Sequence, residues 1–371
     1  MARALASETI RVLVLIKGLG IGGAEKLISE GSRFWDRDSF DYTVAYVLPW
    51  KDQLVGVLED QGIDVHMIGG ERGLTPPTLG RLRGLVKDLD VDLIHAHLPT
   101  MGIVARLVSP VPVVYTEHNM ADSYRPITRT MNRLTYGRNA VATAVSGAVA
   151  GSVSGWPGQP PVVIPNGVAV RIEPDDVAAA RQELRLSSSD PLVAHVGNIR
   201  PGKGHDVLID AVAHLHQRMP SVRFVSIGGE KYPGDLDRVR NRAIEAGLED
   251  HLRFMGRRPD ALGFVAAADI FVNPSTVEGL PVAILEAMAL GRPVVAAAAG
   301  GVPGIVKDGE TGILVEPNEP KALAAGIEKL LNDPFLAERL GQAAQDMVEK
   351  EYGLEPMVQA TEDIYRQVVR G

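Results

Sequence analysis

The sequence predicts an α/β protein with two doubly wound, Rossmann-like domains, and three observations support this fold class. Short runs rich in β-branched residues alternate with helical stretches along the whole chain. Such runs, buried on both faces and separated by helices, are typical of parallel sheets covered by helices. The length of 371 residues exceeds one ordinary hydrophobic core. A proline-rich stretch also interrupts the alternation near the middle of the chain.

The expected strands form two groups. The first half contains RVLVLI, YTVAYVL, VDLIHAHL and VPVVYTE, and the second half contains LVAHVGN, RFVSIGG, IFVNPS and PVVAAA. Residues 156–176, which contain five prolines, mark the expected junction. We therefore expect a first domain over residues 1–170 and a second over 171–349, facing each other across a cleft. The last segment, from about Gly341 to Val369, is expected to form one helix. The end of that helix, about residues 350–371, is expected to pack back on the first domain.

The composition limits the class of protein. With 45% hydrophobic and 23% charged residues, the chain should be folded throughout. It has no cysteine, so disulfides, thiolate metal sites and thiol nucleophiles are excluded. The start lacks an apolar signal core, and RVLVLI is too short to span a bilayer. We expect a soluble, cytoplasmic protein.

The net charge of −8 is distributed unevenly. Through Val170 there are 16 Lys/Arg and 16 Asp/Glu, whereas the remainder has 22 and 30. A general nucleic-acid binder is therefore disfavoured, while the first half is basic enough to approach anionic lipid or a phosphorylated acceptor. Arg125, Arg129 and Arg133 recur every four residues and share a helix face. That face either contacts acceptor phosphate or lipid on the inner face of the plasma membrane, or is simply solvated.

Two glutamates eight positions apart form the most informative pattern. Glu278 is expected in a loop, Pro281 at a helix start, and Glu286 about two turns inside the helix. A helix N-terminus that faces a loop collects anions through its free amides. From Pro281 to Glu286 the helix rises roughly 7.5 Å, about the reach from a diphosphate to a ribose diol, which a carboxylate can bind. The pattern predicts a nucleotide-sugar site.

A basic loop follows the strand LVAHVGN. It contains Arg200 and Lys203 between glycine and proline residues. Both side chains are suited to hold a diphosphate, because an arginine guanidinium can donate two parallel hydrogen bonds to a phosphate and a lysine ammonium is a compact positive charge. The alternative is an exposed basic loop with no ligand.

A glycine-rich loop follows the strand RVLVLI. Residues 18–23 match GxGxxG, whose glycines allow a backbone turn to approach a phosphate. A dinucleotide site would also need an acid at the end of the next strand, but Asp41 precedes its strand. A dehydrogenase site and a simple tight turn both remain open here.

Histidines end two of the expected strands. His118 follows VPVVY and could bond a sugar hydroxyl or the transferring group, or be a satisfied loop residue. His95 and His97 are expected to point to alternate faces of their strand and to be structural, with no third metal ligand nearby.

Two DxD pairs are present, a pattern that can hold a metal on a nucleotide sugar. Asp90 and Asp92 precede a strand, and Asp235 and Asp237 fall inside an expected helix. We therefore expect no metal site.

Taken together, these segments resemble the family-4 glycosyltransferases of the GT-B fold (glycosyl transferases group 1). The resemblance covers nearly the whole chain. It rests on GGAE at Gly22, TEHN at His118, VSGAV, IPNG, KGHDVLI at Lys203, FMGRRPD at Gly256, EGLPVAILEAMALGRPVVA and DGETGILV. It implies donor binding mostly by the second domain, acceptor binding mostly by the first, domain closure, retention of configuration, and no metal or other cofactor.

The resemblance also implies roles for individual residues. Glu286 would hold the ribose hydroxyls, and Glu278 the donor sugar together with the Gly279 and Leu280 amides. Lys203 and Arg200 would hold the diphosphate, on which the Gly22 and Gly23 backbone would close. Gly256 and Arg257 would border the base, and His118 would face the reacting sugar.

Two departures from the family pattern stand out. Asn198 follows Gly197 where many members have Gly-Arg, so the phosphate arginine must be Arg200 or be absent. Gly304 stands where many members have an acid.

The implied reaction moves a sugar from a UDP- or GDP-sugar to an acceptor hydroxyl, with front-face attack in which the departing phosphate takes the proton. A nucleotide-sugar epimerase, an NAD-dependent oxidoreductase and a non-catalytic sugar-nucleotide binder remain alternatives.

Overall fold

A computed structural model of the chain describes residues 9–71, 73–187 and 189–370. The chain divides into two compact units. Unit 1 comprises residues up to 167 together with those from 354 onward, and unit 2 comprises residues 168–353. The division falls inside the proline-rich stretch 156–176.

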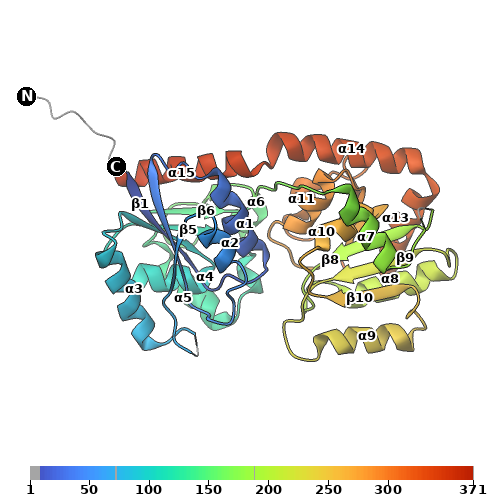
Figure 1. The fold of residues 1–371 in the computed structure, drawn as a ribbon, viewed down its shortest axis with the longest axis horizontal. Coiled ribbons are helices and arrows are strands. Elements are labelled where there is room, and N and C mark those ends of the chain that lie inside the picture. Colours follow the sequence, from blue (N-terminus) through green and yellow to red (C-terminus); the bar gives the residue numbers. More distant parts are fainter. Residues whose placement is uncertain (1–8, 72, 188, 371) are drawn as a thin grey trace, which may run out of the picture. The chain divides into compact units, whose positions relative to one another are not determined.

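Unit 1 contains a seven-stranded sheet in the order β3-β2-β1-β4-β5-β6-β7, and neighbouring strands are parallel. Its strands are β1 (Ile10–Ile16), β2 (Phe40–Tyr46), β3 (Asp64–Met67), β4 (Leu93–His97), β5 (Val113–Glu117), β6 (Val141–Ala144) and β7 (Val162–Val163). Its helices are α1 (Gly23–Gly31), η1 (Ser32–Phe34), α2 (Val55–Glu59), α3 (Pro76–Asp88), α4 (Pro99–Val108), η2 (Ala121–Ser123), α5 (Pro126–Tyr136), α6 (Gly147–Ser152) and α15 (Leu354–Arg370) (Figure 1).

Unit 2 contains a six-stranded parallel sheet in the order β10-β9-β8-β11-β12-β13. Its strands are β8 (Leu192–Val196), β9 (Arg223–Ile227), β10 (Leu252–Gly256), β11 (Ile270–Asn273), β12 (Val294–Ala297) and β13 (Ile313–Val315). Its helices are α7 (Pro174–Glu183), α8 (His205–His216), α9 (Asp235–Glu245), α10 (Ala261–Ala267), α11 (Val282–Ala289), α12 (Val302–Ile305), α13 (Pro320–Asn332) and α14 (Pro334–Glu351). The predicted class of two parallel-sheet, Rossmann-like folds is confirmed.

Strand β1 shows that both faces of the unit 1 sheet are covered. Its side chains alternate between two cores, with Val12 and Val14 in one and Leu13 and Leu15 in the other. Helix α15 closes the first of these cores through Ile364 and Tyr365. A strand buried on both faces must be apolar throughout, and IRVLVLI is nearly so.

The helical segment near the carboxyl terminus differs from expectation. A single helix from about Gly341 is wrong, because α14 ends at Glu351 and α15 begins at Leu354. The interruption is held in place by Tyr352, whose carbonyl accepts the amide of Val168 at 2.8 Å. The two helices belong to different units.

Each sheet reverses its strand order at one point. The reversal lies between β1 and β4 in unit 1 and between β8 and β11 in unit 2. Doubly wound sheets bind ligands beyond the carboxyl ends of strands at such a point. The loops that follow these strands are therefore the first place to look for a site.

Candidate functional site

The candidate site of unit 2 lies in two loops at the order reversal. The β8 loop (residues 197–204) follows β8, and the β11 loop (residues 274–281) follows β11. The Gly202 carbonyl accepts the amide of Thr276 at 2.9 Å and so joins the loops. Gly204 brings them close, since its φ is +71° and a Cβ there would lie 2.1 Å from the Pro274 carbonyl oxygen. A side chain at position 204 would therefore force the loops apart.

Lys203 and Glu278, one from each loop, form an ion pair in which the acid is buried and the lysine is half-buried. Lys203 Nζ donates to Glu278 Oε1 at 2.7 Å and to Oε2 at 2.9 Å. The exposed fraction of the side chain is 6% for Glu278 and 17% for Lys203. Asn273 Nδ2 lies 3.5 Å from Glu278 Oε1, so an amide also faces this carboxylate. The pair offers a ligand both a phosphate-binding cation and a hydroxyl-binding acid.

Glu286 lies on α11, directly after the β11 loop. Pro281 is the N-cap of α11, and Glu286 is the fifth helical residue. The expected depth of two turns is wrong, because five residues after Pro281 make only about 1.4 turns. Glu286 is buried. Gly279 and Leu280 lie just before the N-terminus of α11, whose first amides have no carbonyl partner within the helix.

The remaining predicted residues of unit 2 lie along the same edge of the sheet. Arg200 lies half-buried in the β8 loop. Gly256 ends β10, two strands away, and its carbonyl accepts the amide of Gly228 at 2.8 Å. Arg257 is exposed, and its side chain lies against Gly229. A Cβ added at Gly229 would be 2.8 Å from Arg257 Nε.

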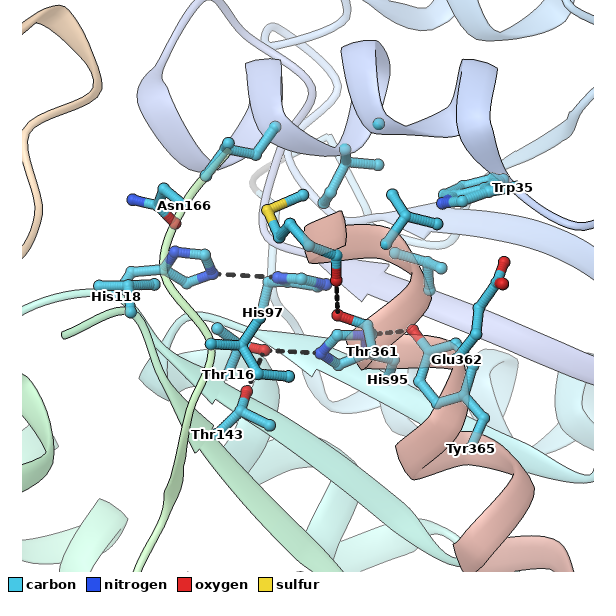
Figure 2. A pocket seen from close by; sticks show the side chains of 18 of the residues that line it. Trp35, His95, His97, Thr116, His118, Thr143, Asn166, Thr361, Glu362 and Tyr365 are labelled. Carbon is cyan, nitrogen blue, oxygen red and sulfur yellow. Dashed lines mark hydrogen bonds between the residues drawn. The ribbon is translucent and has the colours of Figure 1, made fainter. Parts of the chain in front are cut away.

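His118 lies beyond β5 in unit 1 and contacts a second histidine. Its Nε2 is 3.0 Å from Nδ1 of His97, the last residue of β4. His95, two residues earlier, contacts Tyr365 Oη at 2.5 Å and Thr116 Oγ1 at 2.7 Å. Figure 2 shows this chain of contacts across the ends of β4 and β5.

The expectation that His95 and His97 point to alternate faces is wrong. Their ring centroids lie 4.1 Å apart, and both rings line one cavity of about 70 Å³. Side chains two positions apart in a strand share a face, which is the rule that the expectation misapplied. His97 is therefore a partner of His118 that we did not predict.

Desolvation lowers the pKa of all three histidines, of which His95 and His97 are buried and His118 is half-buried. Desolvation lowers the pKa of His118 to about 4. The pKa of His95 is lowered to about 3, chiefly by burial and secondly by the neighbouring His118. The pKa of His97 is also lowered, again chiefly by burial. At neutral pH the His97–His118 contact therefore joins one N–H donor to one bare nitrogen. A neutral His118 can exchange a hydrogen bond with a ligand hydroxyl but carries no charge to offset a phosphate.

The histidine cluster should make unit 1 less stable in mild acid. The folded-state pKa values lie below the unfolded value of about 6.5, so the stabilisation is complete above pH 6.5 and is lost as the pH falls. We expect His118→Asn to reduce the loss of unfolding free energy between pH 7 and pH 5 by about 1 kcal/mol. Urea unfolding at both pH values measures this loss. An unchanged difference between the two pH values would contradict a neutral His118.

Gly22 and Gly23 form the start of α1. Gly22 is the N-cap and Gly23 the first helical residue. The Glu25 carboxylate lies against Gly22, since an added Cβ would be 2.5 Å from Glu25 Oε2. Asp41 is the second residue of β2 and thus lies near its amino end, away from the carboxyl edge where a dinucleotide ribose would bind. This placement disfavours the dehydrogenase interpretation of the glycine loop.

The two DxD pairs have other surroundings. Asp90 and Asp92 bind Arg11 at 2.6 and 3.3 Å, and Asp235 and Asp237 lie in the first turn of α9. Across residues 9–71, 73–187 and 189–370, no three His, Asp or Glu side chains group in a way that fits a metal ion.

Asn273 is a second site residue that we did not predict. It is the last residue of β11 and is almost fully buried, and its Oδ1 accepts the Ser275 amide at 3.0 Å. Its position at the end of a strand next to the order reversal is the signal that could have found it.

Comparisons with known proteins cover both units. The family described as Glycosyl transferases group 1 matches residues 176–347, and the family described as Glycosyltransferase Family 4 matches residues 21–171.

A D-inositol 3-phosphate glycosyltransferase of Corynebacterium efficiens is 34% identical over 282 residues, which are 69% of this chain and 66% of that protein. The chain thus spans about two thirds of the length of that relative. A GDP-mannose-dependent alpha-(1-6)-phosphatidylinositol monomannoside mannosyltransferase of Mycolicibacterium smegmatis is 30% identical over 289 residues, 73% of this chain and 75% of that protein.

The crystal structure of Anabaena HepE in complex with UDP-glucose matches with a TM-score of 0.84 and 25% identity. The match covers 96% of this chain and 100% of that one.

Proposed function

We propose that this chain, which belongs to the group 1 glycosyltransferases of family 4, moves a sugar from a nucleoside diphosphate sugar to the hydroxyl of a phosphorylated or lipid-linked acceptor. The observation that carries the proposal is the Lys203–Glu278 pair at the order reversal of unit 2. The relatives' names support the substrate classes, because they include a GDP-mannose-dependent enzyme and acceptors that are inositol phosphates or phosphatidylinositol mannosides.

We assign the donor to unit 2. Glu286, on the first turns of α11, binds the ribose hydroxyls, and Glu278 binds the donor sugar together with the Gly279 and Leu280 amides. Lys203 and Arg200, from one loop, bind the diphosphate. The Gly256–Arg257 segment borders the base. In support, all these residues lie at the carboxyl edge of one sheet, where doubly wound folds bind nucleotides.

Lys203 is the group best placed to assist departure of the leaving group. As the bond from sugar to phosphate breaks, negative charge grows on the diphosphate, and a fixed cation stabilises this state more than the ground state. A lysine ammonium has three N–H donors, so Lys203 can keep one bond to Glu278 and direct another to a phosphate oxygen. We propose that this cation and the α11 N-terminus make a metal unnecessary.

We assign the acceptor to unit 1, beside His118. Its neutral imidazole can bond an acceptor or donor hydroxyl. The Gly22–Gly23 backbone at the start of α1 offers amides to a phosphate. No residue stands out as a covalent nucleophile, so we propose retention of configuration by front-face attack, with the departing phosphate oxygen taking the acceptor proton.

A screen of nucleotide sugars tests the proposal. Binding to the folded state raises the melting temperature by mass action, so one UDP- or GDP-sugar should raise it more than the others. That donor should then be consumed with inositol phosphates or phosphatidylinositol mannosides, in EDTA as well as without it. Stabilisation without product from any acceptor would favour a non-catalytic binder, and a spectral change with NAD would favour an oxidoreductase.

Glu286→Ala should weaken use of the donor. Loss of a hydrogen bond to a charged group costs about 1.5–3 kcal/mol, so kcat/KM for the donor should fall about 10- to 150-fold. Glu310→Ala, at an exposed glutamate before β13, is the control and should match the wild type. Wild-type donor kinetics in Glu286→Ala would contradict the assigned ribose contact.

A further inference from the structure

Helix α5 of unit 1 carries an exposed apolar stripe. The exposed fractions of Ile127, Met131 and Leu134 are 75%, 38% and 70%. Their spacing of four and three residues places them on one side of the helix. Single exposed apolar residues are common, but a contiguous stripe on one helix indicates an interaction surface.

An arginine stripe runs beside the apolar one. Arg125 directly precedes α5, Arg129 and Arg133 follow at intervals of four residues, and all three are exposed. At about 100° per residue, Thr130 lies between the two stripes on the exposed side. Arg129 pairs with Asp122 at 2.7 Å. Arg125 and Arg133 have no ion-pair partner within the part of the chain that the structure describes.

The charge around α5 departs from that of the rest of the molecule. Residues 121–140 contain four arginines and one acid, whereas the whole chain has a net charge of −8. Apolar side chains flanked by arginines are the composition of helices that lie in the interface of an anionic bilayer. None of the helices in the described ranges has the length and hydrophobicity needed to cross a membrane.

We propose that α5 docks unit 1 on an anionic lipid bilayer. Ile127, Met131 and Leu134 enter the boundary between headgroups and acyl chains, and Arg125 and Arg133 bind lipid phosphates. Charge complementarity selects this partner, since a neutral apolar partner would not need the arginines. The set Arg125, Ile127, Met131, Arg133 and Leu134 is called the α5 surface below.

The buried side of α5 ties this surface to the segment that carries His118. Asn132 Nδ2 donates to Glu117 Oε2 at 3.1 Å, and Asn132 Oδ1 accepts from Arg106 Nη2 at 2.5 Å. Tyr124, just before α5, also donates to Glu117. Because Glu117 directly precedes His118, a bilayer at the α5 surface would bring a lipid-borne acceptor close to the assigned acceptor site. Only this last step rests on the proposed function, whereas docking itself does not.

Vesicle sedimentation with the full chain tests the docking. We expect binding to vesicles of phosphatidylcholine with phosphatidylglycerol, no binding to phosphatidylcholine alone, and release at high salt because the charges are exposed. Arg125→Gln with Arg133→Gln should weaken the partition by about 30-fold, from about 1 kcal/mol for each arginine. Ile127→Ser with Leu134→Ser should weaken it at least about tenfold.

Unit 2 supplies matched controls. Ile244→Ser with Phe335→Ser removes exposed apolar side chains of α9 and α14, and Lys321→Gln with Lys329→Gln removes exposed charges of α13. Both control variants should partition like the wild type. Equal binding to neutral vesicles, no binding at all, or equal losses in the control variants would overturn the proposal. Transfer to a water-soluble acceptor by the Ile127→Ser/Leu134→Ser variant should stay at the wild-type rate, so failed docking and failed catalysis are distinguishable.

Discussion

Replacing Lys203 with methionine should lower the free energy of unfolding of unit 2 by about 3 kcal/mol and reduce sugar transfer by at least about 100-fold. The two losses have different causes. The first arises because Glu278, only 6% exposed, would keep a buried charge without its cation. Breaking a buried pair by removing one partner is costly for this reason. The second arises because the cation that offsets the leaving diphosphate is gone.

A second substitution separates the two effects. Lys203→Met with Glu278→Gln removes both charges, and the glutamine introduced by the second change could still accept a hydrogen bond from the Asn273 amide. Stability should then recover by most of the lost amount, because replacing both members of a buried pair is often nearly neutral. Transfer should not recover, because neither the cation nor the acid is restored. Urea unfolding and initial rates with the donor measure the two quantities.

An exposed ion pair in the same unit provides the control. Arg218 and Glu328 lie 2.8 Å apart, with side chains that are 50% and 29% exposed. Arg218→Met should cost less than about 1 kcal/mol and leave transfer unchanged, since exposed pairs contribute little. Transfer by Lys203→Met at the wild-type rate would remove the central support for the proposed donor site.

The sheets were largely predictable because their central strands are apolar on both faces. Eight runs named from the sequence became β1, β2, β4, β5, β8, β9, β11 and β12. Four of the five missed strands, β3, β7, β10 and β13, are edge strands. Edge strands pair on one side only and need less continuous hydrophobicity, so they leave a weaker pattern. The fifth, β6, is the short run VATA.

The candidate site was only partly predictable. Lys203 and Glu278 were singled out separately, Lys203 from the basic loop that follows a strand and Glu278 from its spacing to Pro281 and Glu286. Their ion pair was not, because it depends on β8 and β11 being neighbours, which the order of strands along the chain does not reveal. His97 was missed because we expected it to point to the opposite face of the strand from His95, whereas side chains two positions apart in a strand share a face. The apolar stripe of α5 was missed because Ile127, Met131 and Leu134 have the same spacing as residues that face a core.

Replacing Gly300 with alanine should disrupt the donor site, although the loop that contains Gly300 contributes no side chain to that site. Gly300 lies between β12 and α12 with a φ of +55°, and a Cβ there would be 1.8 Å from the Glu278 carbonyl oxygen. The next amide, of Gly301, donates to the same oxygen at 3.3 Å. Close approach of two backbones therefore fixes the position of Glu278, and only glycine permits it.

We expect Gly300→Ala to cost about 2–4 kcal/mol of unfolding free energy, from the left-handed φ and from the overlap with backbone. The overlap must be relieved by moving one of the two backbones, and if the backbone at Glu278 moves, kcat/KM for the donor should also fall at least about tenfold. Gly304→Ala is the matched control four residues later. A Cβ there meets nothing within 4 Å, and position 304 is helical, so alanine should be neutral or stabilise by up to about 1 kcal/mol.

Urea unfolding and donor kinetics on both alanine variants measure this contrast. If Gly300→Ala loses stability but keeps its donor kinetics, the loop supports the fold without positioning Glu278. If Gly300→Ala keeps both its stability and its donor kinetics, the β12–α12 loop does not constrain the β11 loop. Close packing against Gly300 would then not be what positions Glu278 to bind a sugar.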